Sequence, residues 1–101
     1  MIYMKEVKKR NYVISEAGEL YIRAQDCGIP TMILLVDGIV ITIFKGDNNR
    51  WIRVSYVLDW YKKEIAYGLE HGYSKTEIET YQNNVKIISK EKAKLVGDSN
   101  E

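Results

Sequence analysis

The amino-acid sequence predicts an α+β domain, with an antiparallel β-meander of about five strands followed by two C-terminal helices packed as a helical hairpin. Two observations support this class. Up to about Ser55 the apolar residues recur at every second position between turn-forming residues, as in strands, and beyond it they recur at every third or fourth position, as in helices. The 101 residues, 46% hydrophobic and 29% charged, have the composition of one folded domain over residues 1–101.

A first β-hairpin is expected near the N-terminus. Residues 11–15 and 19–25 are short β-favouring runs, and Gly18 in the loop between them can take the positive φ that a three-residue hairpin loop needs. The preceding segment, residues 1–10, fits either an edge strand or a flexible arm.

A second hairpin is expected around Asp37-Gly38, a strong signal for a type I′ turn, with strands at Met32–Val36 and Ile39–Lys45. Every residue of Met32–Val36 is apolar, so we expect this strand to be central and covered on both faces. A fifth strand is expected at Trp51–Val54, after the turn-forming residues 46–49.

Two helices are expected in the C-terminal half. The first is capped by Ser55 and ends at Gly72. Its apolar stripe, which excludes Trp60, comprises Leu58, Tyr61, Ile65 and Leu69. The second begins with the capping box Ser74-Lys-Thr-Glu77, and residues 97–101 are expected to fray. Its apolar stripe comprises Ile78, Tyr81, Val85, Ile88 and Leu95.

Residues 67–78, together with Tyr81, resemble the turn region of helix-turn-helix DNA-binding proteins, with Gly72 in the turn and Tyr73 and Ile78 at apolar positions. An αα-hairpin gives the same signals. His71 stands where the DNA-binding pattern has an apolar residue, and the second helix is longer than a usual recognition helix. The αα-hairpin is therefore the favoured interpretation.

Few residues in the sequence could carry catalysis. His71 is the only histidine and Cys27 the only cysteine, so a Ser-His-Asp triad or a His/Cys metal cluster lacks supporting groups. No glycine-rich phosphate-binding motif is present. A carboxylate pair could in principle come from four aspartates, three of which stand in turn signals where aspartate is favoured for backbone reasons: Asp26, Asp37, Asp47 and Asp59. We therefore expect a non-enzymatic protein that uses no cofactor or metal.

A binding surface is better supported. If Leu20 and Ile22 face the core, the alternation of strands turns their neighbours outward, and the same phase applies to the fifth strand. This predicts an aromatic and arginine face made of Tyr21, Arg23, Trp51 and Arg53, with Arg50 in the adjoining turn. Bases stack on aromatic rings and arginine binds phosphates, so the face suits single-stranded nucleic acid. Protein interfaces use the same residue types, and burial of Trp51 under a helix is an equal alternative.

The N-terminal segment is the one clearly basic stretch. Lys8, Lys9 and Arg10, with Lys5, could hold phosphates, although a solvated edge strand is the more ordinary interpretation.

The leading hypothesis is a nucleic-acid-binding module that uses this aromatic and arginine face with help from the basic N-terminal segment. The net charge of +1 gives no global attraction to nucleic acid, so binding must be local. The alternative is a protein-interaction or inhibitor module, for example of viral or mobile-element origin, that uses the same face or the helical hairpin. A homodimer is expected because the apolar third strand and the long helical stripe need cover. The unpaired cysteine and the lack of a secretory signal or membrane span indicate the cytoplasm.

Overall fold

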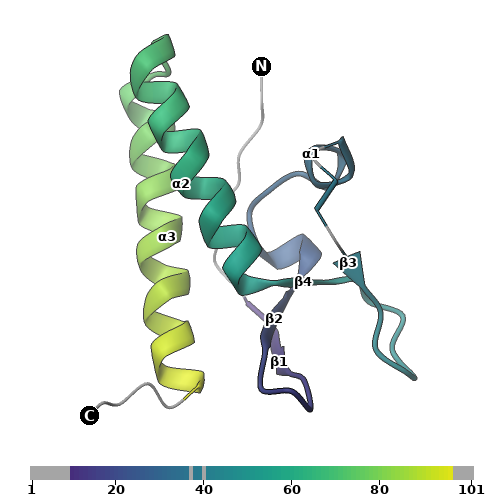
Figure 1. Cartoon of the computed structure of the whole chain (residues 1–101). Helices are drawn as coiled ribbons and strands as arrows, with labels where there is room; N and C mark the ends of the chain where they lie inside the picture. Colours follow the sequence, from purple (N-terminus) through teal and green to yellow (C-terminus); the bar gives the residue numbers. More distant parts are fainter. Residues whose placement is uncertain (1–9, 37, 40, 97–101) are drawn as a thin grey trace.

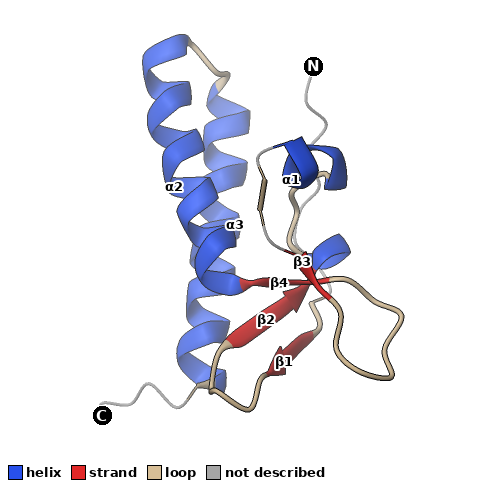
Figure 2. Ribbon diagram, turned by 45° about the vertical axis from the view of Figure 1, so that its right-hand side comes forward, coloured by secondary structure: helices blue, strands red, loops and turns tan. Residues whose placement is uncertain are grey.

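The computed structural model describes residues 10–36, 38–39 and 41–96. It is α+β, as predicted, with an antiparallel four-stranded sheet followed by two C-terminal helices (Figures 1 and 2). In chain order the elements are β1 (Tyr12–Ile14), β2 (Leu20–Arg23), the 3₁₀ turn η1 (Ala24–Asp26), α1 (Thr31–Val36), β3 (Ile41–Thr42), β4 (Trp51–Arg53), α2 (Val54–His71) and α3 (Lys75–Leu95). The expectations for residues 1–9 and 97–101 lie outside the described residues.

The strands lie in the order β1-β2-β4-β3, so the last strand of the chain is inside the sheet. The first hairpin is confirmed, because Gly18 has φ 85° and the Ser15 N–H donates to the Glu19 carbonyl at 2.9 Å. In the centre of the sheet Ile22 lies opposite Ile52. Both side chains are fully buried on the face that packs against α2.

The predicted strand Met32–Val36 is wrong, since these residues belong to α1. A short run of apolar residues fits a buried strand or a helix equally well by periodicity. Pro30 decides between them, because its carbonyl accepts the N–H groups of Ile33 and Leu34 at 3.0 and 3.3 Å and opens a helical turn. The sheet therefore has four strands rather than about five.

The expectation that this segment is covered on both faces is also wrong. Leu34 is the fully buried residue of α1, whereas Met32 and Val36 are 75% and 82% exposed. The predicted turn at Asp37-Gly38 joins no hairpin: Asp37 lies outside the described residues, and the Gly38 N–H bonds back to the Leu35 carbonyl at 3.3 Å.

Helix α2 follows β4 without a loop. It begins at Val54, so Ser55 is not its cap, and its buried face is rotated from the predicted stripe. Trp60 is buried, whereas Leu69 is 68% exposed. The predicted end is confirmed, since Gly72 has φ 80° and its N–H, followed by that of Tyr73, bonds to the Gly68 carbonyl.

Helix α3 begins as predicted. Ser74 and Glu77 exchange two hydrogen bonds of 3.1 Å in the capping box. The predicted stripe is buried at Ile78, Tyr81 and Ile88, half-buried at Val85, and 45% exposed at Leu95. Both views show α3 running back alongside α2, so the segment that resembles a helix-turn-helix forms an αα-hairpin.

A buried polar contact joins this hairpin to the sheet. The Tyr61 hydroxyl donates to the Cys27 carbonyl at 2.6 Å and accepts from the Asn84 side-chain amide at 3.2 Å. All three residues are fully buried. Burial raises the pKa of the Cys27 thiol to about 11, so this thiol stays protonated at neutral pH.

We predict that Tyr61→Phe lowers the free energy of unfolding by about 1–3 kcal/mol, because it strands a buried carbonyl and a buried amide. Urea denaturation measures the change. The matched control Tyr67→Phe removes a hydroxyl from a ring that is 50% exposed and should change stability little. Equal effects of the two substitutions would contradict the structural role of the Tyr61 hydroxyl.

We predict that Gly68→Ala also destabilises the protein, by about 1–3 kcal/mol, although alanine is the better helix former. A Cβ on Gly68 would lie 2.4 Å from the Tyr73 ring. That ring is held in place by the hydrogen bond from its hydroxyl to Glu64. In a Tyr73→Ala background the same substitution should lower the free energy of unfolding much less. A stabilising effect of Gly68→Ala in the native background would contradict the predicted clash.

Candidate functional site

The strand register places the four predicted face residues on one surface. Tyr21 lies opposite Arg53 and Arg23 lies opposite Trp51, on the side of the sheet away from the buried Ile52. We call this surface the outer face. The β3–β4 loop, residues 43–50, adds Arg50 beside it, with the Arg50 carbonyl accepting the Ala24 N–H at 2.8 Å.

Trp51 does not offer its ring to a ligand, because it is only 7% exposed. Its cover is the β3–β4 loop rather than a helix. Phe44 lies edge-on to Tyr21 and to Trp51, with ring centroids 5.1 and 6.3 Å away. Of the two alternatives predicted for Trp51, burial is therefore the one observed, although its cover is a loop and not a helix. Strand alternation assigned it the correct face but could not show that a loop returns over that face.

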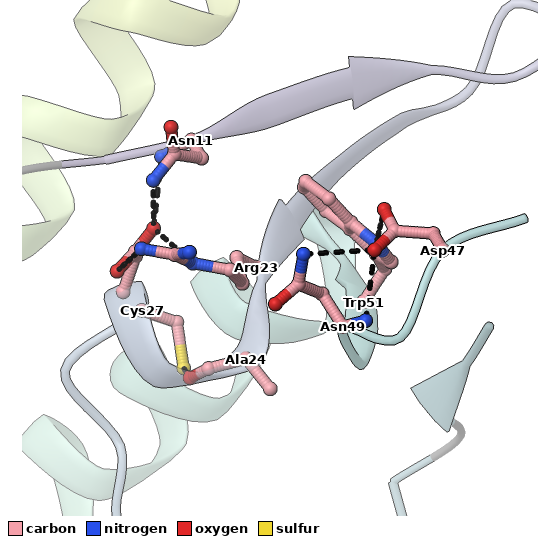
Figure 3. Close-up of polar contacts among 8 residues, drawn as sticks. Asn11, Arg23, Ala24, Cys27, Asp47, Asn49 and Trp51 are labelled. Atoms are coloured by element: carbon pink, nitrogen blue, oxygen red, sulfur yellow. Dashed lines mark hydrogen bonds and ion pairs between the residues drawn. The ribbon is translucent and has the colours of Figure 1, made fainter. Parts of the chain in front are cut away.

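Asp47 holds this loop closed. Its carboxylate accepts the Trp51 indole N–H at 2.9 Å, and it accepts the backbone and side-chain N–H groups of Asn49 at 2.8 Å each (Figure 3). The backbone N–H of Asn49 is the main cause of a lowered pKa at Asp47, with a further contribution from Trp51. The carboxylate is thus ionised throughout the neutral range and anchors the loop to the outer face.

Asp26 compensates one of the predicted arginines. It forms an ion pair with Arg23, with nitrogen–oxygen distances of 3.0 and 3.2 Å, and accepts two hydrogen bonds from Asn11 (Figure 3). Burial alone would raise the pKa of Asp26, but the bonds from Arg23 and Asn11 outweigh it and the pKa is lowered. Arg23 is therefore fixed in position and locally neutralised.

A recess of about 260 Å³ opens between η1, the start of α1 and the β3–β4 loop. None of its described lining residues is acidic. These are Arg23, Ala24, Gln25, Thr31, Asn48, Asn49 and Arg50. Four lining residues could not be assigned to a common site from the sequence, because they come from three separate segments that only the fold brings together: Gln25, Thr31, Asn48 and Asn49.

Arg50 is the uncompensated charge of this recess. It is exposed, and no acidic side chain in the described part of the chain forms an ion pair with it. The other lining side chains supply amide and hydroxyl donors, together with the fixed guanidinium of Arg23. Such a set of donors suits a phosphate or another anion.

Arg53 occupies the other end of β4. Its Nε donates to the Tyr21 hydroxyl at 3.2 Å, and its guanidinium carbon lies 5.6 Å from the centre of the Tyr56 ring. The bond to Tyr21 raises the pKa of Arg53, which stays charged. Arg53 is exposed and Tyr56 is 38% exposed, so this pair is available at the surface.

Arg10 is not part of the outer face. Its guanidinium forms a two-bonded ion pair with Glu91 of α3, and these bonds lower the pKa of Glu91. Arg10 thus fastens the start of the described chain to the helical hairpin, where a phosphate would have to compete with Glu91 for its guanidinium. Lys8 and Lys9 lie outside the described residues.

The described residues offer little support for a metal site or for a catalytic histidine. No group of three or more His, Cys, Asp or Glu side chains among them could hold a metal ion. His71 is exposed and stacks on Tyr67, with ring centroids 3.8 Å apart. None of the described helices combines the length and apolar character needed to cross a membrane.

Comparison with known proteins gives no relative. No family model, curated protein or solved structure matches this chain. Functional inference therefore rests on the geometry of the outer face and its recess.

We predict that the loop opens only in acid. Because the pKa of Asp47 is lowered in the folded protein, its hydrogen bond to Trp51 stabilises the closed loop fully above the ordinary carboxyl pKa of about 4. This stabilisation is lost as the pH falls through the lower pKa that Asp47 has in the folded protein. In a Trp60→Phe variant, which leaves Trp51 as the sole tryptophan, the tryptophan fluorescence emission should stay constant down to about pH 4 and change below it.

Asp47→Asn should abolish this change in emission, whereas Asp59→Asn, at an exposed ion pair with Lys63, should leave it in place. A transition that survives Asp47→Asn, or that is centred above pH 4, would contradict the assignment to Asp47.

Proposed function

We propose that this protein is a non-enzymatic module that binds single-stranded nucleic acid through the outer face. The observation that carries the proposal is the recess of about 260 Å³, which has Arg23 and Arg50 in its wall and no acidic lining residue among those described. Phosphate is the anion that such a recess fits, because guanidinium and amide donors bind its oxygens together.

The Arg53–Tyr56 pair supports the same proposal. Arg50 and Arg53 are three residues apart on an extended segment, which separates them by about 10 Å. A nucleotide chain that places a phosphate at Arg50 can therefore reach Arg53, where Tyr56 offers a ring for stacking. A flexible single strand follows such a surface more readily than a duplex, because its bases are free to turn toward the ring.

Trp51 has a different role in this proposal from the one the sequence predicts. Its indole N–H holds the Asp47 carboxylate, and Asp47 holds Asn49. Trp51 is then a positioning residue that keeps the polar loop beside the recess. The unpaired, buried Cys27 agrees with a reducing compartment, and we propose the cytoplasm as the site of action.

A protein-interaction module is the second candidate function. It is favoured by the exposed apolar side chains of α1, where Met32, Leu35 and Val36 are between 59% and 82% exposed. A patch of this kind is typical of protein contacts.

We predict that a fluorescently labelled single-stranded oligonucleotide binds at low salt and that binding weakens steeply as salt rises. Two phosphate contacts, at Arg50 and Arg53, give a slope of about −1.4 in log K against log salt for a single strand, or about 7-fold between 50 and 200 mM. Fluorescence anisotropy measures both quantities. A duplex of the same sequence should bind more weakly.

Arg50→Gln should weaken binding and reduce the slope by about 0.7, because it removes one phosphate contact. Arg53→Gln should weaken binding as well. The matched control Lys86→Gln, an exposed position on α3, removes the same charge from another surface and should have little effect. No binding at 50 mM salt, or an equal effect of Lys86→Gln, would refute the proposal.

A further inference from the structure

The recess beside the outer face has a closed floor. The Ala24 N–H donates to the Arg50 carbonyl at 2.8 Å, which joins the start of η1 to the residue before β4. Ala24 itself is only 4% exposed. The rim around this floor comes from three segments, which contribute Gln25, Thr31 and Asn48. A nucleotide strand cannot pass through such a recess, so any group that binds in it enters and leaves by the same mouth.

This shape favours the end of a strand over its middle. An internal phosphate has a nucleoside on each side, and both would have to leave through the one mouth. A terminal phosphate has a single connection and can be enclosed by the walls. The recess of about 260 Å³ is several times the roughly 30 Å³ that a water molecule occupies in the liquid, so a whole phosphate group fits.

The recess also offers more hydrogen-bond donors than an internal phosphate can use. Two of the five N–H donors of Arg23 bond to Asp26, and three remain. Arg50 has no acidic partner among the described residues, and Gln25 and Asn48 add side-chain amides. An internal phosphodiester presents two free oxygens and one negative charge. A terminal phosphate presents three oxygens and nearly two charges at neutral pH, and therefore matches these donors better.

We propose that the recess binds the terminal phosphate of a single strand, so that the protein recognises phosphorylated ends rather than internal positions. The inference rests on the proposed function, because it names the part of the nucleic acid that the recess holds. The ligand class is a phosphomonoester at the 5′ or the 3′ end. Arg50 supplies the uncompensated charge, and Arg23, fixed by Asp26, presents its remaining donors. Arg53 is not among the lining residues and contacts the strand that follows.

The second ionisation of the ligand gives an independent measurement. A phosphomonoester takes up a proton near pH 6 and then carries one charge, as an internal phosphodiester does. Two described carboxylates bond to lining residues of the recess: Asp26 to Arg23, and Asp47 to Asn49. Both stay ionised from pH 7.5 to 5.5, since the pKa of each is lowered. A preference for phosphorylated ends should therefore shrink over this range because the ligand, and not the recess, changes its charge.

Three single-stranded oligonucleotides of one sequence test the proposal: one with a 5′ phosphate, one with a 3′ phosphate, and one with hydroxyl groups at both ends. An internal fluorescent label leaves the ends free for anisotropy measurements at about 50 mM salt. At pH 7.5 we expect at least one phosphorylated strand to bind about 5-fold more tightly than the hydroxyl-ended strand, because it gains a charge-assisted hydrogen bond at an exposed site. At pH 5.5 the difference should fall below about 2-fold.

Arg50→Gln should remove the preference, so that all three strands bind alike. Arg53→Gln is the matched control. It removes the same charge outside the recess, so it should weaken all three strands by a common factor and leave the preference in place. Both side chains are exposed, and far-UV circular dichroism must show native helix content in each variant.

Binding without preference for either phosphorylated end would overturn the recess proposal and leave the proposed function standing. A preference that survives Arg50→Gln, or that persists unchanged at pH 5.5, would overturn it as well. No binding of any of the three strands would overturn both proposals.

Discussion

The hydroxyl of Tyr61 is the contact on which the rest of the structure depends. It bonds to the Cys27 carbonyl, in the turn after β2, and to Asn84 in the middle of α3, so one buried atom joins the sheet, α2 and α3. Because β4 continues into α2 without a loop, the placement of α2 also fixes the direction of β4. The side chains that β4 turns outward are positioned through this contact.

Asn84 is a fully buried polar residue in an otherwise apolar seam, and it limits how α2 and α3 can pair. A purely apolar seam tolerates a slide of one turn, since one apolar side chain replaces another. Here only the pairing that places Asn84 beside Tyr61 gives the Asn84 side-chain N–H an acceptor. The buried Asn84 Oδ1 has no hydrogen-bond partner among the described residues. The contact thus selects one helical hairpin, together with the close approach of Tyr73 to Gly68 at its tip.

The predictions from sequence succeeded where a local rule decides the outcome. The capping box at Ser74, the helix end at Gly72 and the loop at Gly18 each depend on a few neighbouring residues. Strand alternation likewise assigned Arg23 and Arg53 to one face. The prediction for residues 32–36 failed because an apolar run has no period, and the recess was missed because its walls come from segments that are distant in sequence.

The outer face also shows why a count of arginines misleads. Arg10 and Arg23 are compensated by Glu91 and Asp26, and both serve to hold the chain together. Arg50 and Arg53 have no such acidic partner among the described residues, and they lie at the two ends of β4. A chain with a net charge of only +1 can therefore present a locally positive surface. With Trp51 enclosed by the loop, the nucleic-acid binding that we propose for this face would depend on these two charges more than on stacking.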